Sequence, residues 1–210
     1  PKTDFAPVAK LVNMPLAIAV GGDSPNKTLA DLTNWYKANP DKAAFGTSAA
    51  GSQLHFLGLM YGQAIKMDLT HVAYQGGAPL ITDLIGGQVP AGIDQFPLEF
   101  YKSGKIRLLA TSSAQRSPLI PDVPTFKEQG VNVEGQAWIG AFVPAKTPEA
   151  IVQKIGAALI DAVGQPDVKA KLAAAGMESA GTPAPEYAAE LARDNARWQK
   201  VVEVSGFRAD

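Results

Sequence analysis

Small residues between an expected strand and an expected helix form the segment of this sequence best suited to bind an anion. The segment runs Phe45-Gly-Thr-Ser48-Ala-Ala-Gly51-Ser-Gln-Leu-His55. Small side chains let a ligand approach the backbone, and free N–H groups at a helix start attract a carboxylate. No lysine follows the glycines and their spacing differs from a dinucleotide fingerprint, so the segment is not a nucleotide phosphate loop. An ordinary Gly/Ser turn that caps a helix is the alternative.

A second turn of this kind, Tyr74-Gln-Gly-Gly-Ala-Pro79, follows one strand and helix later. Because neighbouring parallel strands end at the same edge of a sheet, both helix starts would face one crevice. Asp94, at the end of the next expected strand, would also point into it. Its carboxyl could bind an ammonium or hydroxyl group of a ligand or order water, or it could cap the helix expected from Pro97.

The serine segment also resembles a nucleophile elbow, Gly46-Thr-Ser48-Ala-Ala50, with Ala in the last glycine position. A serine hydrolase would need an acid and then a histidine downstream, and Asp68 and His71 follow too closely for that order. We therefore predict no catalytic residue and no enzyme activity. His55 and His71 lie on different expected elements without a clustered carboxylate motif, so we also predict no metal site and no cofactor.

Two further side chains are assigned to packing rather than chemistry. His55 is expected to pack or cap on the flank of an apolar helix face. Trp138 is expected in the core rather than as a platform for a ligand. Gly135 and Gly140 on either side of Trp138 indicate that something packs close to the backbone there.

The composition is that of a folded domain without a strongly charged partner. The 210 residues are 46% hydrophobic and 19% charged, which is enough apolar content for a core. The formal net charge is -1, so the basic footprint of a nucleic-acid or polybasic membrane binder is absent and no nucleic-acid partner is predicted. No apolar run approaches the roughly 18–20 residues of a transmembrane helix. The absence of cysteine excludes disulfides and thiol chemistry.

Strand and helix patterns alternate along the chain and predict an α/β fold. Expected strands cover residues 14–20, 43–47, 70–74, 89–94, 106–111 and 133–143, with helical periodicity between most of them. This alternation predicts mainly parallel sheets with flanking helices. Thr28 and Asp31 have the spacing of a capping box, and Thr147 before Pro148 predicts a further helix start with Thr147 as N-cap. Three prolines predict a stiff extended loop over residues 117–124.

The strands at 14–20 and 133–143 bracket the central block of strands and helices, which predicts an inserted domain. Residues 1–22 and 140–210 would form a first lobe, and residues 23–139 a second. The two bracketing strands would be the crossovers between lobes. A ligand would lie between the lobes, where strand carboxyl ends meet helix amino ends.

An ordered series of motifs resembles the Bug proteins, the periplasmic substrate-binding proteins of tripartite tricarboxylate transporters. The resemblance runs from residue 4 to about residue 202. The matching segments are Asp4-Phe-Ala-Pro-Val8, residues 46–55, residues 71–89, Arg116-Ser-Pro, residues 121–130, residues 138–148 and Trp198. The series as a whole is far more specific than any one of its motifs.

The resemblance implies a two-lobed periplasmic binding protein of the type II kind that closes on a small mono- or dicarboxylate. It would act as a monomer and deliver the ligand to the membrane permease subunits of the transporter. The backbone around Ser48, Ala49, Gly51 and Ser52 would donate to one carboxylate, and Gln75, Gly77, Ala78 and Asp94 would set the distal specificity. Thr47, Tyr74 and Gly76 complete the predicted ligand-binding set.

The sequence departs from the family pattern mainly at its start. Family members carry a signal peptide in the precursor and an opening strand, loop and helix, including a second carboxylate-gripping loop, before the segment that begins at Asp4. We expect the first lobe to be incomplete, either in this version of the chain or in the protein itself. Ala73 replaces a proline found in many relatives, and Gln75 replaces a lysine.

A ligand-sensing effector domain of a bacterial regulator can share the same two-lobed architecture and is the alternative function. No helix-turn-helix pattern is present in the chain to support it. The identity of the bound acid is left open among dicarboxylates, aromatic carboxylates and acidic amino acids.

Overall fold

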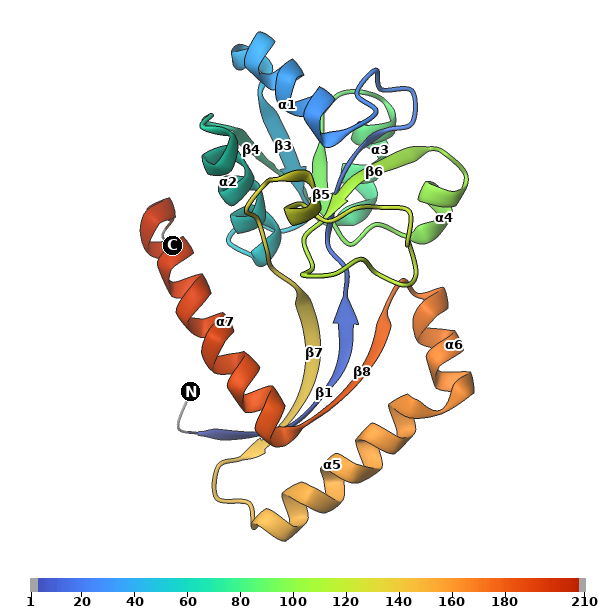
Figure 1. Ribbon diagram of the computed structural model, residues 1–210, viewed down its shortest axis with the longest axis vertical. Coiled ribbons are helices and arrows are strands. Elements are labelled where there is room, and N and C mark those ends of the chain that lie inside the picture. The colour runs from blue at the N-terminus through green and yellow to red at the C-terminus, as the bar shows by residue number, and fades with distance from the viewer. Residues whose placement is uncertain (1–3, 208–210) are drawn as a thin grey trace. The chain divides into compact units, whose positions relative to one another are not determined.

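The computed structural model describes residues 4–207 and divides the chain into two units (Figure 1). Unit 1 contains the chain up to Met14 and residues 137–200, and unit 2 contains residues 15–136 and the segment from Val201 onward. These boundaries differ from the predicted ones at 22/23 and 139/140. Residues 1–3 and 208–210, which the predicted lobes included, lie outside the described residues.

Unit 2 contains a five-stranded sheet of mixed direction. Its strands, in spatial order, are β4 (Thr70–Ala73), β3 (Ala44–Thr47), β5 (Gly92–Asp94), β2 (Ala17–Gly21) and β6 (Ile106–Thr111). Strand β3 runs parallel to β4 and β5, whereas β2 runs antiparallel to β5 and β6. The prediction of a mainly parallel sheet is therefore wrong. Alternation of strands and helices determines how the elements follow one another, but it does not determine the direction in which a strand such as β2 is inserted.

The strand expected over residues 14–20 is in fact the junction of two strands. Strand β1 (Phe5–Met14) ends before Pro15, which has no N–H group to donate to a sheet. Strand β2 then begins at Ala17, and all five of its residues are buried between β5 and β6. The pairing of β2 is the reason that the boundary lies at 14/15 rather than at 22/23.

Helix α1 (Leu29–Ala38) begins with the predicted capping box. The Thr28 hydroxyl accepts a hydrogen bond from the Asp31 N–H at 3.1 Å, and the Asp31 carboxylate accepts one from the Thr28 N–H at 2.9 Å. Leu29, Leu32 and Tyr36 are buried along one face. The helix ends just before Pro40, which begins a short 3₁₀ turn (Pro40–Lys42), as expected from the restriction that proline places on the preceding residue.

Three more helices complete unit 2: α2 (Gln53–Ile65), α3 (Gly77–Ile85) and α4 (Leu98–Lys102). Helix α2 lies so close to β3 that a Cβ on Gly58 would be 2.0 Å from the Phe45 ring. Only glycine fits this approach. Part of the core on the α3 side is a cluster that includes Ala17, Leu80, Leu84, Phe96 and Ile106.

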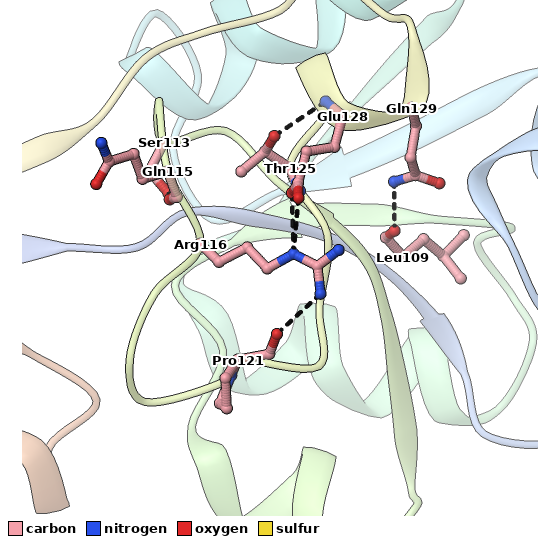
Figure 2. A network of polar contacts seen from close by, with 8 residues as sticks. All are labelled: Leu109, Ser113, Gln115, Arg116, Pro121, Thr125, Glu128 and Gln129. Carbon is pink, nitrogen blue, oxygen red and sulfur yellow. Dashed lines mark hydrogen bonds and ion pairs between the residues drawn. The ribbon is translucent and has the colours of Figure 1, made fainter.

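The proline-rich segment over residues 117–124 is fixed by its flanks (Figure 2). The Arg116 Nε donates to both carboxylate oxygens of Glu128, at 2.9 and 3.0 Å, and its Nη1 donates to the Pro121 carbonyl at 3.0 Å. The segment is not extended as predicted but makes two turns, because the side chains of Ile120 and Val123 are buried beneath it. A 3₁₀ turn (Lys127–Gln129) follows.

Unit 1 contains a three-stranded antiparallel sheet in which β1 lies between β7 (Ala137–Pro144) and β8 (Glu178–Pro183) (Figure 1). The helices are α5 (Glu149–Gly164), α6 (Pro166–Ala174) and α7 (Ala184–Ser205), whose last residues belong to unit 2. The strand expected from residue 133 begins only at Ala137, because Gly135 is hydrogen-bonded to Ser112 in unit 2.

The start of α5 differs from its prediction. The N-cap is Pro148, whose ψ of 138° is extended, and not Thr147. The N–H groups of Ile151 and Val152 bond to the Pro148 carbonyl, at 2.9 and 3.2 Å, so the first turn begins one residue later than expected. Proline has the φ that a helix needs, but its ψ still decides whether it lies inside or before the first turn.

Trp138 has the packing role that the sequence predicts. Its ring makes an edge contact with the buried Tyr187 at 5.2 Å between centroids, and its Nε1 donates to Asp194 at 3.0 Å. A Cβ on Gly140 would lie 2.1 Å from the Tyr187 hydroxyl. The close backbone approach expected beside Trp138 is therefore made by the protein's own Tyr187.

Candidate functional site

The ends of three parallel strands meet at one edge of the sheet in unit 2. Strand β3 lies between β4 and β5, so Thr47, Ala73 and Asp94 mark a common edge. Helix α2 begins after β3 and helix α3 begins after β4, so each helix starts on the same side as the strand ends. Helix starts carry unpaired N–H groups and a partial positive charge. The sheet therefore brings the two predicted turns to one edge.

The first turn, residues 47–52, is held by its own side chains. The Ser52 hydroxyl donates to the Ala49 carbonyl at 2.8 Å and accepts from the Leu54 N–H at 3.2 Å, which makes Ser52 the N-cap of α2. The buried Thr47 hydroxyl donates to the same carbonyl at 3.3 Å. Ser48 and Ala49 are half-buried between these anchors. Internal hydrogen bonds therefore hold this turn in shape.

Two stacked histidines support this turn. The rings of His55 in α2 and His71 in β4 lie 3.9 Å apart with an interplanar angle of 16°. His55 Nδ1 accepts from the Gly51 N–H at 3.3 Å, and His71 Nε2 lies 2.7 Å from the Thr47 hydroxyl. Burial lowers the pKa of His55, and burial together with neighbouring His55 lowers the pKa of His71 to about 4. Both rings are therefore neutral near pH 7.

His55 confirms its predicted packing and capping role. It is 7% exposed, and its bond to the Gly51 N–H means that this donor, assigned to a ligand at the sequence level, already has a weak internal partner. Gly51 has a φ of +69°, and a Cβ there would lie 2.7 Å from the Phe207 ring. Phe207 also makes edge contacts with His55 and Phe56. The backbone conformation and the packing both require glycine at Gly51.

The second turn, residues 74–77, has less side-chain support than the first. Gly76 is the N-cap of α3, with φ +103° and ψ 173°, and no side chain caps the helix. Apart from its chain neighbours, no described residue lies within 4 Å of a Cβ placed on Gly76. Gln75 and Ala78 are exposed. The Tyr74 hydroxyl instead donates to the carboxylate of Asp83, a residue of α3, at 2.9 Å. The Cβ position of Gly76 at the start of α3 is therefore unfilled.

Asp94 lies at the end of β5, between the two turns. Its Oδ1 accepts from the Gln95 N–H at 2.7 Å, and its buried Oδ2 has no hydrogen-bond partner among residues 4–207. The Oδ2 atom is 4.0 Å from a Cβ placed on Gly77. Burial raises the pKa of Asp94, while the Ser48 hydroxyl and the N–H groups of Gln95 and Ser48 offset part of that rise. Asp94 thus connects the first turn to the start of α3.

The alternative role of Asp94 as a helix cap is ruled out. Helix α4 begins after Pro97 and has no side-chain cap. Of the predicted set, the structure therefore places Ser48, Gly77 and Asp94 near one another, while Tyr74 is directed to Asp83.

Sequence reasoning missed the supporting role of His71 and Phe207. His71 was considered only as part of a hydrolase triad or a metal site, and Phe207 was not considered at all. The spacing of His71 from Thr47 carries no signal, because the two meet only through strand pairing in the register Thr47↔Ala73 and Phe45↔His71. The single available hint was Gly51, because a glycine between small polar residues often accommodates a close neighbour.

Known proteins share the sequence pattern and the fold of this chain. Residues 1–207 match the model of the tripartite tricarboxylate transporter family receptor. The chain belongs to this family. The resemblance to the Bug proteins drawn from the motifs is confirmed by a solved structure, periplasmic binding protein BugD, which is 29% identical over 98% of this chain and 71% of its own, with a TM-score of 0.81.

Two other solved structures of this fold hold carboxylates. R. palustris Rpa4515 with adipate is 31% identical to this chain, with a TM-score of 0.84 over 98% of this chain and 70% of its own. MatC from Rhodopseudomonas palustris with bound malate is 31% identical, with a TM-score of 0.77 over 94% and 69%. The predicted periplasmic-binding-protein fold is thus confirmed.

The match covers only part of these proteins. The chain spans between 52% and 64% of the length of five curated relatives that it matches. Within residues 4–207, no helix is both long enough and apolar enough to cross a membrane.

Proposed function

We propose that this protein is a periplasmic solute-binding protein that captures a small mono- or dicarboxylate and delivers it to the permease of a tripartite tricarboxylate transporter. It acts by binding and not by catalysis, and it works as a monomer. The observation that carries the proposal is the common edge of β3, β4 and β5, where two helix starts and the buried Asp94 converge. The carboxylates held by the related Rpa4515 and MatC support the same ligand class.

The first turn would bind one carboxylate of the ligand. The backbone N–H groups of residues 48–50 and 52 and the Ser48 hydroxyl are the donors, because the Gly51 N–H is bonded to His55, and Thr47 and Ser52 hold the loop in shape. Donors fixed before binding cost little ordering entropy, which favours a small, rigid anion. Gln75, Gly77, Ala78 and Asp94 would contact the rest of the ligand, with Tyr74 and Gly76 shaping the edge.

A calorimetric screen of mono- and dicarboxylates of three to six carbons tests this proposal. We expect at least one acid to bind, and its dimethyl ester to fail because it lacks the charge that the helix start attracts. Equal binding of acid and ester, or binding of no acid at millimolar concentration, would contradict it. Hydrolysis of the ester would point to an enzyme instead. Uptake of the bound acid into permease-containing vesicles, dependent on added protein, tests the delivery step.

A further inference from the structure

The carboxyl group of Asp94 is the least satisfied polar group at the candidate site. Asp94 is 9% exposed, and its Oδ1 accepts a hydrogen bond from the Gln95 N–H at 2.7 Å. Its Oδ2 is buried without one in the part of the chain described. A buried carboxylate oxygen without a donor is costly, so such an arrangement is retained where another molecule supplies the donor.

The surroundings of Oδ2 show from which side a donor would come. Among the described residues, and leaving out the neighbouring backbone, the Oδ2 atom at 4.0 Å is the only heavy atom within 4 Å of a Cβ built on Gly77, and none lies that close to one built on Gly76. Apart from the Asp94 carboxyl, no described side chain therefore packs against the Cβ position of Gly77. Helix α3 has nine residues and no side-chain cap, so the N–H groups of its first turn also lack a capping side chain there.

Ser48 links Asp94 to the carboxylate site of the first turn. The Ser48 hydroxyl and N–H are close enough to the Asp94 carboxyl to lower its pKa. A serine hydroxyl carries a single hydrogen. If that hydrogen is given to the carboxylate of a ligand, it is no longer available to Asp94, and the ligand itself must replace it.

We infer that Asp94 is a specificity-determining residue that accepts a hydrogen bond from a hydroxyl or ammonium group on the ligand, so that the site prefers hydroxy- or amino-substituted carboxylates to plain ones. The inference rests on the proposed function. A plain acid leaves Asp94 without a donor, and a second carboxylate placed beside it is repelled if both are ionised. A ligand with a hydroxyl or ammonium group next to its first carboxylate donates a hydrogen bond to Asp94. Neither the missing donor nor the repulsion between carboxylates then opposes its binding.

Matched ligands test the inference with the wild-type chain alone. Calorimetry would compare succinate with malate and aspartate, and adipate with 2-hydroxyadipate and 2-aminoadipate. We expect the hydroxyl- or ammonium-bearing member of at least one set to bind about tenfold more tightly than the plain acid, the size of a charge-assisted hydrogen bond. Preference for the ammonium over the hydroxyl would show that Asp94 is ionised in the complex, and the reverse order that a neutral donor suffices; both support the inference.

Equal affinity within both sets, or tighter binding of the plain acids, would overturn the inference while leaving the proposed function intact. Failure of every carboxylate to bind would overturn both.

The Asp94→Asn variant, which keeps an acceptor oxygen but loses the charge, should reduce the ligand preference to about threefold or less. The exposed Asp122, changed to Asn, is the matched control and should leave the preference unchanged. An Asp94→Asn protein that folds, as judged by circular dichroism, and keeps the full preference would contradict the assignment to Asp94. If that variant does not fold, the ligand series on the wild-type chain decides the question.

Discussion

The two turns at the candidate site follow neighbouring strands, yet they are stabilised in different ways. The turn before α2 is braced by the Ser52 cap, the Thr47 hydroxyl and a pair of stacked histidines. The turn before α3 has the Tyr74–Asp83 hydrogen bond and the backbone conformation of Gly76, without a side-chain cap, and the carboxyl of Asp94 lies nearby. Similar sequences of small residues can therefore have different roles. The first turn holds its N–H donors in place, and the second leaves room for part of a ligand.

The largest expected effect comes from disrupting the packing of helix α2 against β3, which supports the first turn. Gly58→Val places a side chain where a Cβ already lies 2.0 Å from the Phe45 ring, so α2 cannot keep its distance from β3. We expect a loss of about 3 kcal/mol of unfolding free energy, measured by urea denaturation. Gly164→Ala is the control, because nothing lies within 4 Å of its Cβ position and stability should hardly change. Equal stability of the two variants would show that α2 packs differently.

A matched pair of substitutions compares the turns directly. Gly76→Ala, at φ +103° and ψ 173°, should cost about 2 kcal/mol, because that region is nearly restricted to glycine. Gly51→Ala, at φ +69°, should cost about 1 kcal/mol for the backbone plus the contact with Phe207. Adding Phe207→Ala should recover the contact cost only in the Gly51 variant. Thermal denaturation measures the stability of each variant. If Phe207→Ala restores stability to both the Gly51→Ala and the Gly76→Ala proteins, Phe207 does not distinguish the two turns.

Ser48→Ala tests the donor role of the first turn. The hydroxyl donates to no backbone group that shapes the loop, so the fold should be retained while affinity for the best carboxylate falls about tenfold. Titration calorimetry of the wild type and the variant measures this change. Ser103→Ala, at the C-cap of the short helix α4, is a control in which affinity should be unchanged. An unaltered affinity of the Ser48→Ala variant would show that the ligand carboxylate does not bind at this loop.

The smallest expected effect concerns the stacked histidines. Folding lowers the pKa of His71 from 6.5 to about 4. Between pH 4 and pH 6.5 the unfolded chain therefore binds a proton at this residue more readily than the folded chain does. The stabilisation by neutral His71 is therefore complete above about pH 6.5 and is lost as the pH falls toward 4. Solvent screening of a partly exposed ring reduces the loss to about 1 kcal/mol.

Urea denaturation at pH 7.5, 5.5 and 4.5 measures the effect of His71. The His71→Asn variant lacks the titrating ring, so its stability should fall less over this range than that of the wild type. Parallel curves for the two proteins would show that His71 does not contribute.

Much of the fold follows from local patterns. The capping box at Thr28 and the helix starts at Ser52 and Gly77 depend on contacts within a few residues, so they could be predicted. The break at Pro15 and the direction of β2 depend on pairing with strands far along the chain. Alternation of elements carries no information about that pairing, so the parallel sheet and the 22/23 boundary were expected in error.

The sequence by itself determined the family, the alternation of elements and the two small-residue turns, because these are properties of residue type and spacing. Only the tertiary structure decided that Asp94 caps no helix and keeps one oxygen unsatisfied beside Gly77. It also decided that His71 stacks on His55 beneath the first turn. Both facts arise from strands that pair across the sheet, and the distance between paired residues in space is independent of their distance along the chain.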